Sequence, residues 1–251
     1  MKKLILFFTL LVLLGAWGCK KETTAPIVPP VTEAPAPKVK TIVHNLGIIG
    51  YIDTFRYDAT GRLISRTTSD GYTHSISYTS GMAIDSYYSS SGFVLGTETY
   101  FLNADQRADS LKKIYLGATT YVKYTYDSEG HLTVQKSLDD THAVTFIDNF
   151  IWENDNNTEV YRTSSTSQFI SHTVNYYDDT HKNTIGNQNT GRNFFGVDSK
   201  NSVVSQYYTS SSSTLSIYNF VNTYDAQERM AQFIIYNNSG SMNSSGVYTY
   251  Y

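Results

Sequence analysis

The chain has 251 residues, and 19 lysines and arginines stand against 22 aspartates and glutamates, which leaves a net charge of −3. No basic face with interleaved aromatic residues stands out, so the sequence gives no support to nucleic-acid binding. A single cysteine excludes an internal disulfide, and stability must therefore come from packing.

Residues 1–18 have the features of a bacterial signal peptide. Two lysines open the segment, residues 4–14 are apolar apart from Thr9, and Cys19 follows a glycine. The apolar run is shorter than the roughly 20 residues of a transmembrane helix. The arrangement resembles a lipoprotein signal, in which the cysteine is lipidated and becomes the mature N-terminus. An ordinary secretory signal with a stray cysteine is the alternative. We expect a lipid anchor on Cys19 that holds the protein at the outer membrane, on its periplasmic side or at the cell surface.

All five prolines lie between residues 20 and 40. Such a segment cannot build a core and favours an extended polyproline II helix, with about 3.1 Å per residue. We expect residues 19–40 to form a tether of up to roughly 60 Å that begins at the lipidated cysteine. Residues 41–251 contain no proline and have a suitable length for a single all-β domain.

The first motif of this domain, residues 55–63, predicts a strand, a tight turn and a second strand. Aromatic residues are favoured in strands, and Phe55 and Tyr57 share one face. Asp58 suits the first position of a type I turn, where its carboxylate accepts a backbone hydrogen bond. Gly61 can take the left-handed conformation that leads into the next strand. We therefore predict that Asp58 and Gly61 are structural turn residues.

A second hairpin follows directly. Residues 72–79 alternate strictly between large and small polar side chains, which is the period of a half-buried strand. Residues 82–88 can return as its partner after a turn at Ser80 and Gly81. His74 falls on the apolar face, where a core or rim histidine with satisfied hydrogen bonds is expected rather than a ligand.

The opening motif recurs along the chain. The best copies are residues 124–132, with turn residues Asp127 and Gly130, and residues 220–230, with Asp225. Weaker copies have anchors at Asn103, Glu153 and Asp178, while Gln106, Asn156 and Glu228 occupy glycine positions. The anchors recur at multiples of about 21–26 residues, a period typical of repeated supersecondary units. We predict an all-β fold, an antiparallel β-hairpin meander of about 14 strands that forms a curled sheet or barrel-like domain. A long loop at residues 181–202 interrupts it.

These motifs resemble known repeats. The Tyr-Asp-x-x-Gly-Arg-Leu core at residues 57–63, with its echoes at 126–132 and 224–230, resembles the YD repeats of Rhs-type proteins. The whole layout is similar to a family of uncharacterised Bacteroidota lipoproteins with a porin-like β fold. The shared features are Cys19-Lys20-Lys21, the proline tether, the degenerate hairpins, Ser199-Lys200-Asn201 and the aromatic C-terminus. The resemblance implies a fold and no activity, because that family carries none that is established.

The sequence contains no recognisable catalytic or metal-binding motif. No serine lies in Gly-x-Ser-x-Gly, and no two of the six histidines have metal-ligand spacing. Residues 153–157 offer oxygen ligands at alternate positions, yet they lack the glycine and terminal glutamate of a calcium loop. We therefore expect no enzymatic activity, no cofactor and no metal.

The 22 tyrosines are the remaining functional signal. Cross-strand pairing and core filling account for most such residues, and the functional alternative is a platform for a ligand. The candidate ligand-facing aromatics are Tyr78, Tyr124, Tyr126 and Trp152. Our main hypothesis is a non-enzymatic binding or scaffold module for a glycan or an amphipathic ligand.

Two alternatives remain open. One is a barrel-like carrier that encloses a lipid or another apolar ligand, in a cavity lined by residues such as Ile76, Tyr124, Tyr126 and Trp152. The other is an outer-membrane pore, whose lipid-facing strands need about 9–11 residues with an unbroken apolar outer face. The position of His74 on the apolar face of its strand argues against the pore. The oligomeric state is left open.

Overall fold

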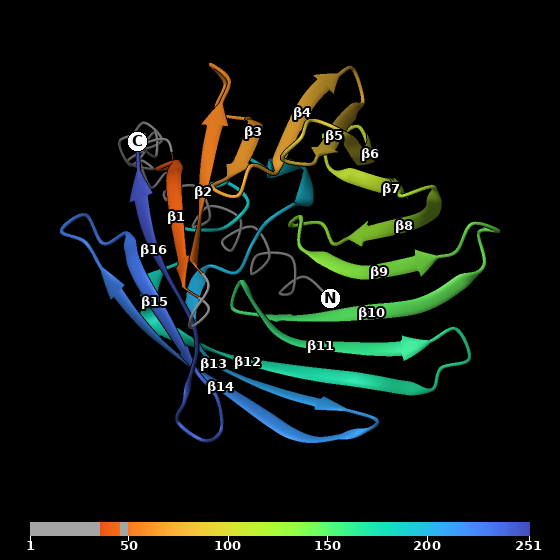
Figure 1. Ribbon diagram of the computed structural model, residues 1–251. Coiled ribbons are helices and arrows are strands. Elements are labelled where there is room, and N and C mark those ends of the chain that lie inside the picture. Colours follow the sequence, from red (N-terminus) through yellow and green to blue (C-terminus); the bar gives the residue numbers. More distant parts are fainter. Residues whose placement is uncertain (1–35, 46–49) are drawn as a thin grey trace, which may run out of the picture. The chain divides into compact units, whose positions relative to one another are not determined.

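The computed structural model describes residues 36–45 and 50–251, and residues 36–251 form one compact unit. Within these residues, sixteen strands form an antiparallel meander that closes into a barrel, because β1 (Val39–Asn45) pairs with β16 (Met242–Tyr250) (Figure 1). The predicted meander is confirmed, and of the two predicted forms the closed barrel is the one present. The signal peptide, Cys19 and most of the tether lie outside the described residues.

Each of the other strands pairs with its two neighbours in sequence. They are β2 (Gly50–Tyr57), β3 (Leu63–Thr68), β4 (Thr73–Thr79), β5 (Met82–Tyr88), β6 (Val94–Leu102), β7 (Ala108–Tyr115), β8 (Ala118–Tyr126), β9 (Leu132–Leu138), β10 (Val144–Glu153), β11 (Asn156–Ser164), β12 (Phe169–Lys182), β13 (Asn201–Ser210), β14 (Ser213–Tyr224) and β15 (Met230–Tyr236). One short 3₁₀ helix, η1 (Asn193–Phe195), lies between β12 and β13. No helix among the described residues is long and apolar enough to cross a membrane.

The number of strands is larger than the predicted 14, and β1 begins earlier than the predicted domain boundary. Several connections contain only two residues: 80–81, 116–117, 154–155 and 211–212. The connections 116–117 and 211–212 lack the spacing between aspartate and glycine from which hairpins were predicted, so the strands beside them were not all counted. Val39 and Lys40, which we had assigned to the tether, belong to β1.

The predicted turn geometry is confirmed at the best copies of the motif. Gly61 has a φ of 79° and donates its N–H to the Asp58 carbonyl at 3.0 Å. The Asp58 carboxylate accepts the N–H of Arg62 at 2.9 Å. Gln106 and Glu228 take the same left-handed conformation, with φ of 61° and 59°. Turn geometry is therefore kept at these positions even where the glycine has been lost.

Two weaker copies were assigned wrongly. At residues 153–157 the left-handed residues are Asn154 and Asp155, with φ of 52° and 63°, whereas Asn156 begins β11. Two consecutive left-handed residues make a two-residue hairpin connection, for which asparagine and aspartate are suited. Asp178 anchors no hairpin, because it lies inside β12.

The strands present different side chains to the inside and the outside of the barrel. In β4, Ile76 is buried while Ser75 and Ser77 on either side are exposed. His74, on the inner face as predicted, lies 3.2 Å from Asp85 Oδ2. The alternation follows from the two-residue period of a strand. In β4 the apolar side chains therefore face the inside of the barrel, and serine and threonine form the outer face.

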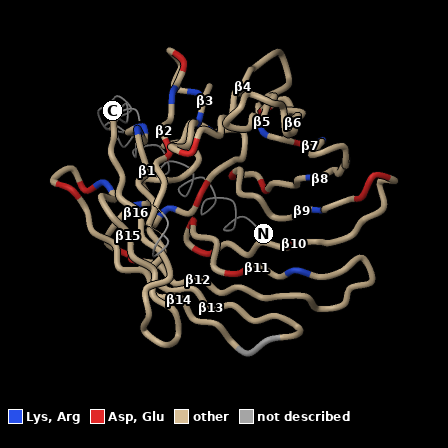
Figure 2. The backbone as a smooth tube through the Cα atoms, viewed as in Figure 1, with Lys and Arg blue, Asp and Glu red and all other residues tan. Residues whose placement is uncertain are grey.

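The meander places alternate connections at opposite ends of the barrel. The termini end carries the start of β1, Tyr251 and the connections 58–62, 80–81, 103–107, 127–131, 154–155, 183–200 and 225–229. The distal end carries the connections 69–72, 89–93, 116–117, 139–143, 165–168, 211–212 and 237–241. Acidic and basic residues are spread around the barrel, and neither sign gathers on one side (Figure 2).

Candidate functional site: a cavity inside the barrel

The long connection at residues 183–200, here called the plug segment, lies where a loop was predicted and lines the inside of the termini end (Figure 1). Its hydrogen bonds reach partners on successive strands around the barrel. The bonds join Thr184 Oγ1 to Met230 N (2.8 Å), Asn189 O to Val39 N (3.1 Å), Gly191 O to Leu63 N (3.0 Å), Val197 N to Gly130 O (3.0 Å) and Lys200 N to Asp155 O (2.9 Å). The segment therefore follows the inner circumference from β15 past β1 and β3 to the β10–β11 connection.

Two glycines let the plug segment approach the barrel wall closely. Gly191 has a φ of 70°, and a Cβ atom there would lie 2.6 Å from Leu63 N. Gly196 has a φ of 84°, and its Cβ would lie 2.5 Å from Gly130 O. Any other residue would clash with backbone as well as adopt a left-handed conformation.

Aromatic side chains join the plug segment to the barrel wall. Phe194 is buried, and its ring centroid lies 4.9 Å from that of Tyr100. Tyr78 packs against Phe194, and Tyr124 packs against Phe195, with ring centroids 6.4 Å apart in each pair. Burial raises the pKa of Tyr78 to about 12, so its hydroxyl stays neutral.

The other two predicted aromatics also lie near the plug segment. A Cβ atom on Gly196 would lie 2.8 Å from the Tyr126 ring. Trp152 stacks on His131 with ring centroids 4.3 Å apart, and His131 forms a β-bridge with Val197 of the plug segment. The indole N–H of Trp152 donates to Leu132 O at 2.8 Å. The structure thus brings all four predicted aromatics toward the plug segment. Their role in contacting a ligand stays a prediction, because none of the four lines the cavity described next.

A cavity of about 630 Å³ lies between the plug segment and the barrel wall. Its wall comes from β1, β2, β3, β13, β14, β15 and β16. The apolar lining includes Ile42, Phe55, Phe220, Phe233, Ile235 and Tyr248. The polar lining includes His44, Asp53, Arg66, Arg192, Asp198 and Asn222. The volume is in the range of small-molecule sites, which are mostly apolar with a few placed polar groups.

Asp53 is the centre of the polar lining and is only 1% exposed. Its Oδ2 accepts a hydrogen bond from Arg66 Nη2 at 2.8 Å and lies 3.0 Å from His44 Nε2. Asp53 Oδ1 and Arg66 Nε are buried, and neither has a hydrogen-bond partner in the described part of the chain. Most buried polar atoms in proteins are hydrogen-bonded, so these two unpaired atoms on one ion pair leave a free acceptor and a free donor at the cavity wall.

The plug segment contributes two charged residues to the same cavity. Burial raises the pKa of Asp198, which accepts a hydrogen bond from the Asn187 N–H. Arg192 lines the cavity, and its side chain forms no ion pair or hydrogen bond with any described residue. The cavity therefore holds one guanidinium free to contact a ligand.

Sequence reasoning missed this site. Asp53 shares strand parity with Phe55 and Tyr57, so its inward position was readable from the alternation. Its neighbours in the cavity were not readable, because β14 to β16 reach β1 only when the barrel closes. Arg192 and Asp198 lie in an irregular segment without a motif.

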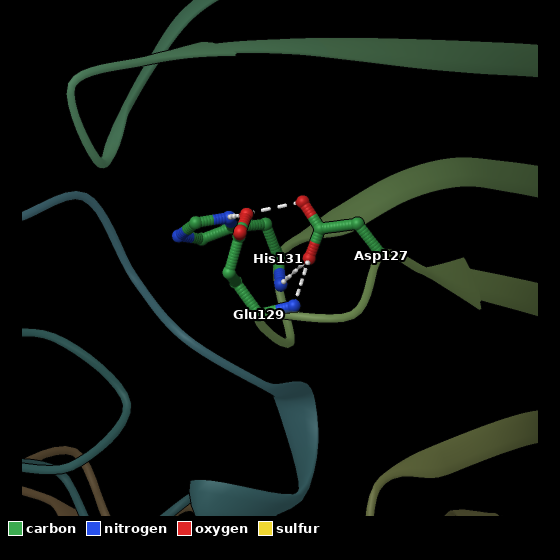
Figure 3. Close-up of side chains that lie close together, drawn as sticks. All are labelled: Asp127, Glu129 and His131. Carbon is green, nitrogen blue, oxygen red and sulfur yellow. Dashed lines mark hydrogen bonds and ion pairs between the residues drawn. The ribbon is translucent and has the colours of Figure 1, made fainter. Parts of the chain in front are cut away.

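A second cluster lies at the β8–β9 connection, where Asp127, Glu129 and His131 turn toward one another (Figure 3). Potential ligand atoms of the three side chains lie within 4.8 Å of one another, which is compatible with a metal ion. However, Asp127 Oδ1 already accepts the N–H groups of Glu129, Gly130 and His131, and Asp127 Oδ2 lies 3.0 Å from His131 Nδ1. The side chain of Glu129 is 74% exposed.

The other turns explain this cluster without a metal. In the turn that begins at Asp58, Arg62 Nε donates to the carboxylate at 2.7 Å, and Arg229 does the same to Asp225. His131 occupies the same position relative to its aspartate. The cluster is therefore one more turn closed by a side-chain contact to the aspartate, in which histidine stands in place of arginine.

The fold is a closed 16-stranded meander barrel with a segment folded into one end, and solved structures share its architecture. A porin-like protein from Bacteroides uniformis has a TM-score of 0.66 and 13% identity, and the match covers 87% of this chain and 98% of that chain. A porin-like protein from Bacteroides vulgatus has a TM-score of 0.60 and 10% identity, over 86% and 99% of the two chains. The chain is thus similar to Bacteroides porin-like proteins in fold.

A partial match to the crystal structure of TcdB2-TccC3-Cdc42 has a TM-score of 0.18, which is too low to indicate a shared fold. No protein-family model and no curated protein matches the chain.

Proposed function

We propose that the protein is a non-enzymatic binding barrel of the bacterial cell envelope, anchored through a lipid on Cys19, and that its cavity takes an amphipathic ligand. The cavity carries this proposal, because it joins an apolar wall to a buried ion pair with unpaired hydrogen-bonding atoms. A ligand with one polar end and one apolar end matches both parts.

Three short strands and the outer face of β4 argue against a membrane-spanning pore. Strands β3, β4 and β5 have 6, 7 and 7 residues, whereas strands that span a bilayer need about 9–11. Ser75, Ser77 and Thr79 are exposed on the outer face of β4, where lipid would require apolar side chains. The plug segment also occupies the termini end of the barrel. The likeness to porin-like proteins therefore supports the barrel architecture rather than conduction.

The inner ion pairs favour binding over catalysis. His44 and His74 each pair with a buried aspartate, an arrangement that in hydrolases orients a base toward a nucleophile. Among the described residues, neither histidine has a hydroxyl or thiol within hydrogen-bonding distance. Each pair gives one oxygen of its buried aspartate a polar partner inside the barrel.

Uptake of an uncharged fluorescent naphthylamine tests the proposal, because its emission rises in an apolar cavity. We expect the chain to bind the dye and Ile235→Phe, which fills the cavity, to lose most of this signal. Ile234→Phe on the outer face of the same strand is the matched control and should bind as before. Equal dye binding by both variants would contradict a cavity site. Steady conductance of the purified chain in planar bilayers would favour the pore.

The anchor is tested separately by Cys19→Ser. We expect this variant to leave the membrane fraction when cells are fractionated, whereas the unaltered chain stays with the outer membrane. Retention of the variant in that fraction would show that attachment does not depend on the cysteine.

A further inference from the structure

The ion pair at the centre of the cavity is incompletely bonded. A carboxylate and a guanidinium commonly form two parallel hydrogen bonds. In this pair only one hydrogen bond forms, from Arg66 Nη2 to Asp53 Oδ2 at 2.8 Å. His44 Nε2 lies 3.0 Å from the same carboxylate oxygen. Asp53 Oδ1 and Arg66 Nε stay unpaired among the described residues. Asp53 Oδ1 shares its carboxylate carbon with the bonded Oδ2, and Arg66 Nε shares its guanidinium carbon with the bonded Nη2. The free acceptor Oδ1 therefore lies near the free donor Nε.

We propose that this pair binds a hydroxyl group of the ligand. A hydroxyl donates one hydrogen bond and also accepts, so a single group can satisfy both Asp53 Oδ1 and Arg66 Nε. A carboxylate can only accept and would face the charge of Asp53. An ammonium can only donate and would face the charge of Arg66. The inference rests on the proposed ligand-binding function and names the ligand class, an uncharged amphiphile with a hydroxylated head.

The surrounding residues suit several hydroxyls on one head group. Asn222 Nδ2 donates to Val203 O at 2.8 Å, while its Oδ1 is buried without a partner in the described part of the chain. The free Arg192 guanidinium supplies further donors. The cavity thus offers both acceptors and donors for a polyol. Its apolar wall, which includes Phe220 and Phe233, is suited to an attached alkyl chain.

Three probes with the same alkyl chain separate the head-group chemistries: hexyl β-D-glucoside, hexanoate and hexylammonium. All are used below the concentrations at which they self-associate, and binding to the full chain is measured by isothermal titration calorimetry. We expect the glucoside to bind at least tenfold more tightly than either ion. Hexanoate or hexylammonium binding as tightly as the glucoside would overturn the hydroxyl inference.

Asp53→Asn tests the residue directly, because it replaces a charge-assisted acceptor with a neutral one. We expect at least a tenfold loss of glucoside affinity. Asp85→Asn is the matched control: Asp85 is 4% exposed, pairs with His74 at 3.2 Å and does not line the cavity. It should keep the full affinity. Arg66→Lys keeps the charge opposite Asp53 and removes the free Nε, so it provides a second test if Asp53→Asn fails to fold.

The outcomes distinguish this inference from the function on which it rests. Suppose that Ile235→Phe blocks dye uptake and that all three probes bind with equal affinity. The cavity would then stand as a binding site, and the hydroxyl inference would be overturned. Unchanged glucoside affinity in both Asp53→Asn and Arg66→Lys would do the same. Failure of the dye and of every probe to bind would overturn both.

Discussion

The two ends of the barrel use the same turn geometry but different residues beside it. At the termini end, the carboxylates of Asp58 and Asp225 accept a backbone N–H from the residue four positions on, at 2.9 and 3.0 Å. At the distal end, Asp139 does the same for Ala143 at 2.9 Å, and Ser89 Oγ accepts the Phe93 N–H at 3.1 Å. An aspartate, an asparagine or a serine is therefore enough to make the turn.

What differs is the residue that follows the turn. At the termini end it is an arginine in three turns, and each guanidinium lies over a tyrosine ring. The pairs are Arg62 over Tyr78 (4.4 Å), Arg107 over Tyr126 (5.9 Å) and Arg229 over Tyr250 (4.6 Å). At the distal end the same position holds uncharged residues such as Phe93, Ala143 and Gln168. The tyrosine and arginine of the repeated motif thus mark the end that receives the plug segment, and they are not required for a hairpin.

The largest expected effect is a difference between the ends in the stability lost when a left-handed glycine is replaced. Gly191→Val would place Cβ against Leu63 N in a left-handed residue, and we expect a loss of about 3 kcal/mol or more in the free energy of unfolding. Gly117→Val at the distal end has the same backbone strain with no atom within 4 Å, so about 1–2 kcal/mol is expected. Urea denaturation measures both. Equal losses would show that plug docking adds nothing to stability.

The second prediction concerns the arginines of the termini end. Arg229→Ala removes both the ion pair to Asp225 and the contact with Tyr250, and we expect a loss of about 1–2 kcal/mol. Gln168→Ala at the equivalent distal position should change stability by less than about 0.5 kcal/mol. Thermal melts followed by circular dichroism compare the two. A loss in Gln168→Ala as large as that in Arg229→Ala would contradict the distinction between the ends.

The third prediction is a difference in acid sensitivity. Burial works against ionisation of Asp58, Asp127 and Asp225, but hydrogen bonds from backbone and side chains outweigh it and lower the pKa of each carboxyl. The hydroxyl of Thr180 is the largest of the influences that lower the pKa of Asp178 to about 2.

A carboxyl with a lowered pKa in the folded state stabilises the protein above its unfolded pKa of about 4, and this contribution is lost as the pH falls further. The termini end should therefore lose stability first between about pH 4 and pH 2. Asp139 also has a lowered pKa and gives the distal end a smaller contribution of the same kind. Hydrogen exchange, corrected for the intrinsic pH dependence of each amide, resolves the two ends. Earlier loss of protection in the distal turns would contradict this order.

The smallest expected effect on stability is at Phe93 and Leu116, in two connections of the distal end. Phe93 and Leu116 are 73% and 72% exposed, so replacing both with serine should change the free energy of unfolding by less than about 0.5 kcal/mol. The same substitutions remove apolar surface and should reduce self-association in light scattering. A large loss of stability would show that these tips pack against other parts of the chain.

Much of the architecture could be predicted from local patterns. The alternation at residues 72–79 and the turn at Asp58 gave the hairpins, and the irregular composition of residues 181–202 located the plug segment. The copies at Glu153 and Asp178 were assigned wrongly because an aspartate or asparagine after an aromatic residue also occurs at two-residue turns and within strands.

The sequence by itself determined the all-β meander, because strand period and turn chemistry act over a few neighbouring residues. Only the tertiary structure decided that β1 meets β16, that the plug segment folds inward, and that Asp53 and Arg66 share a cavity with Phe233. These contacts join residues far apart in the chain. They depend on closing the sheet, and no local pattern encodes that closure.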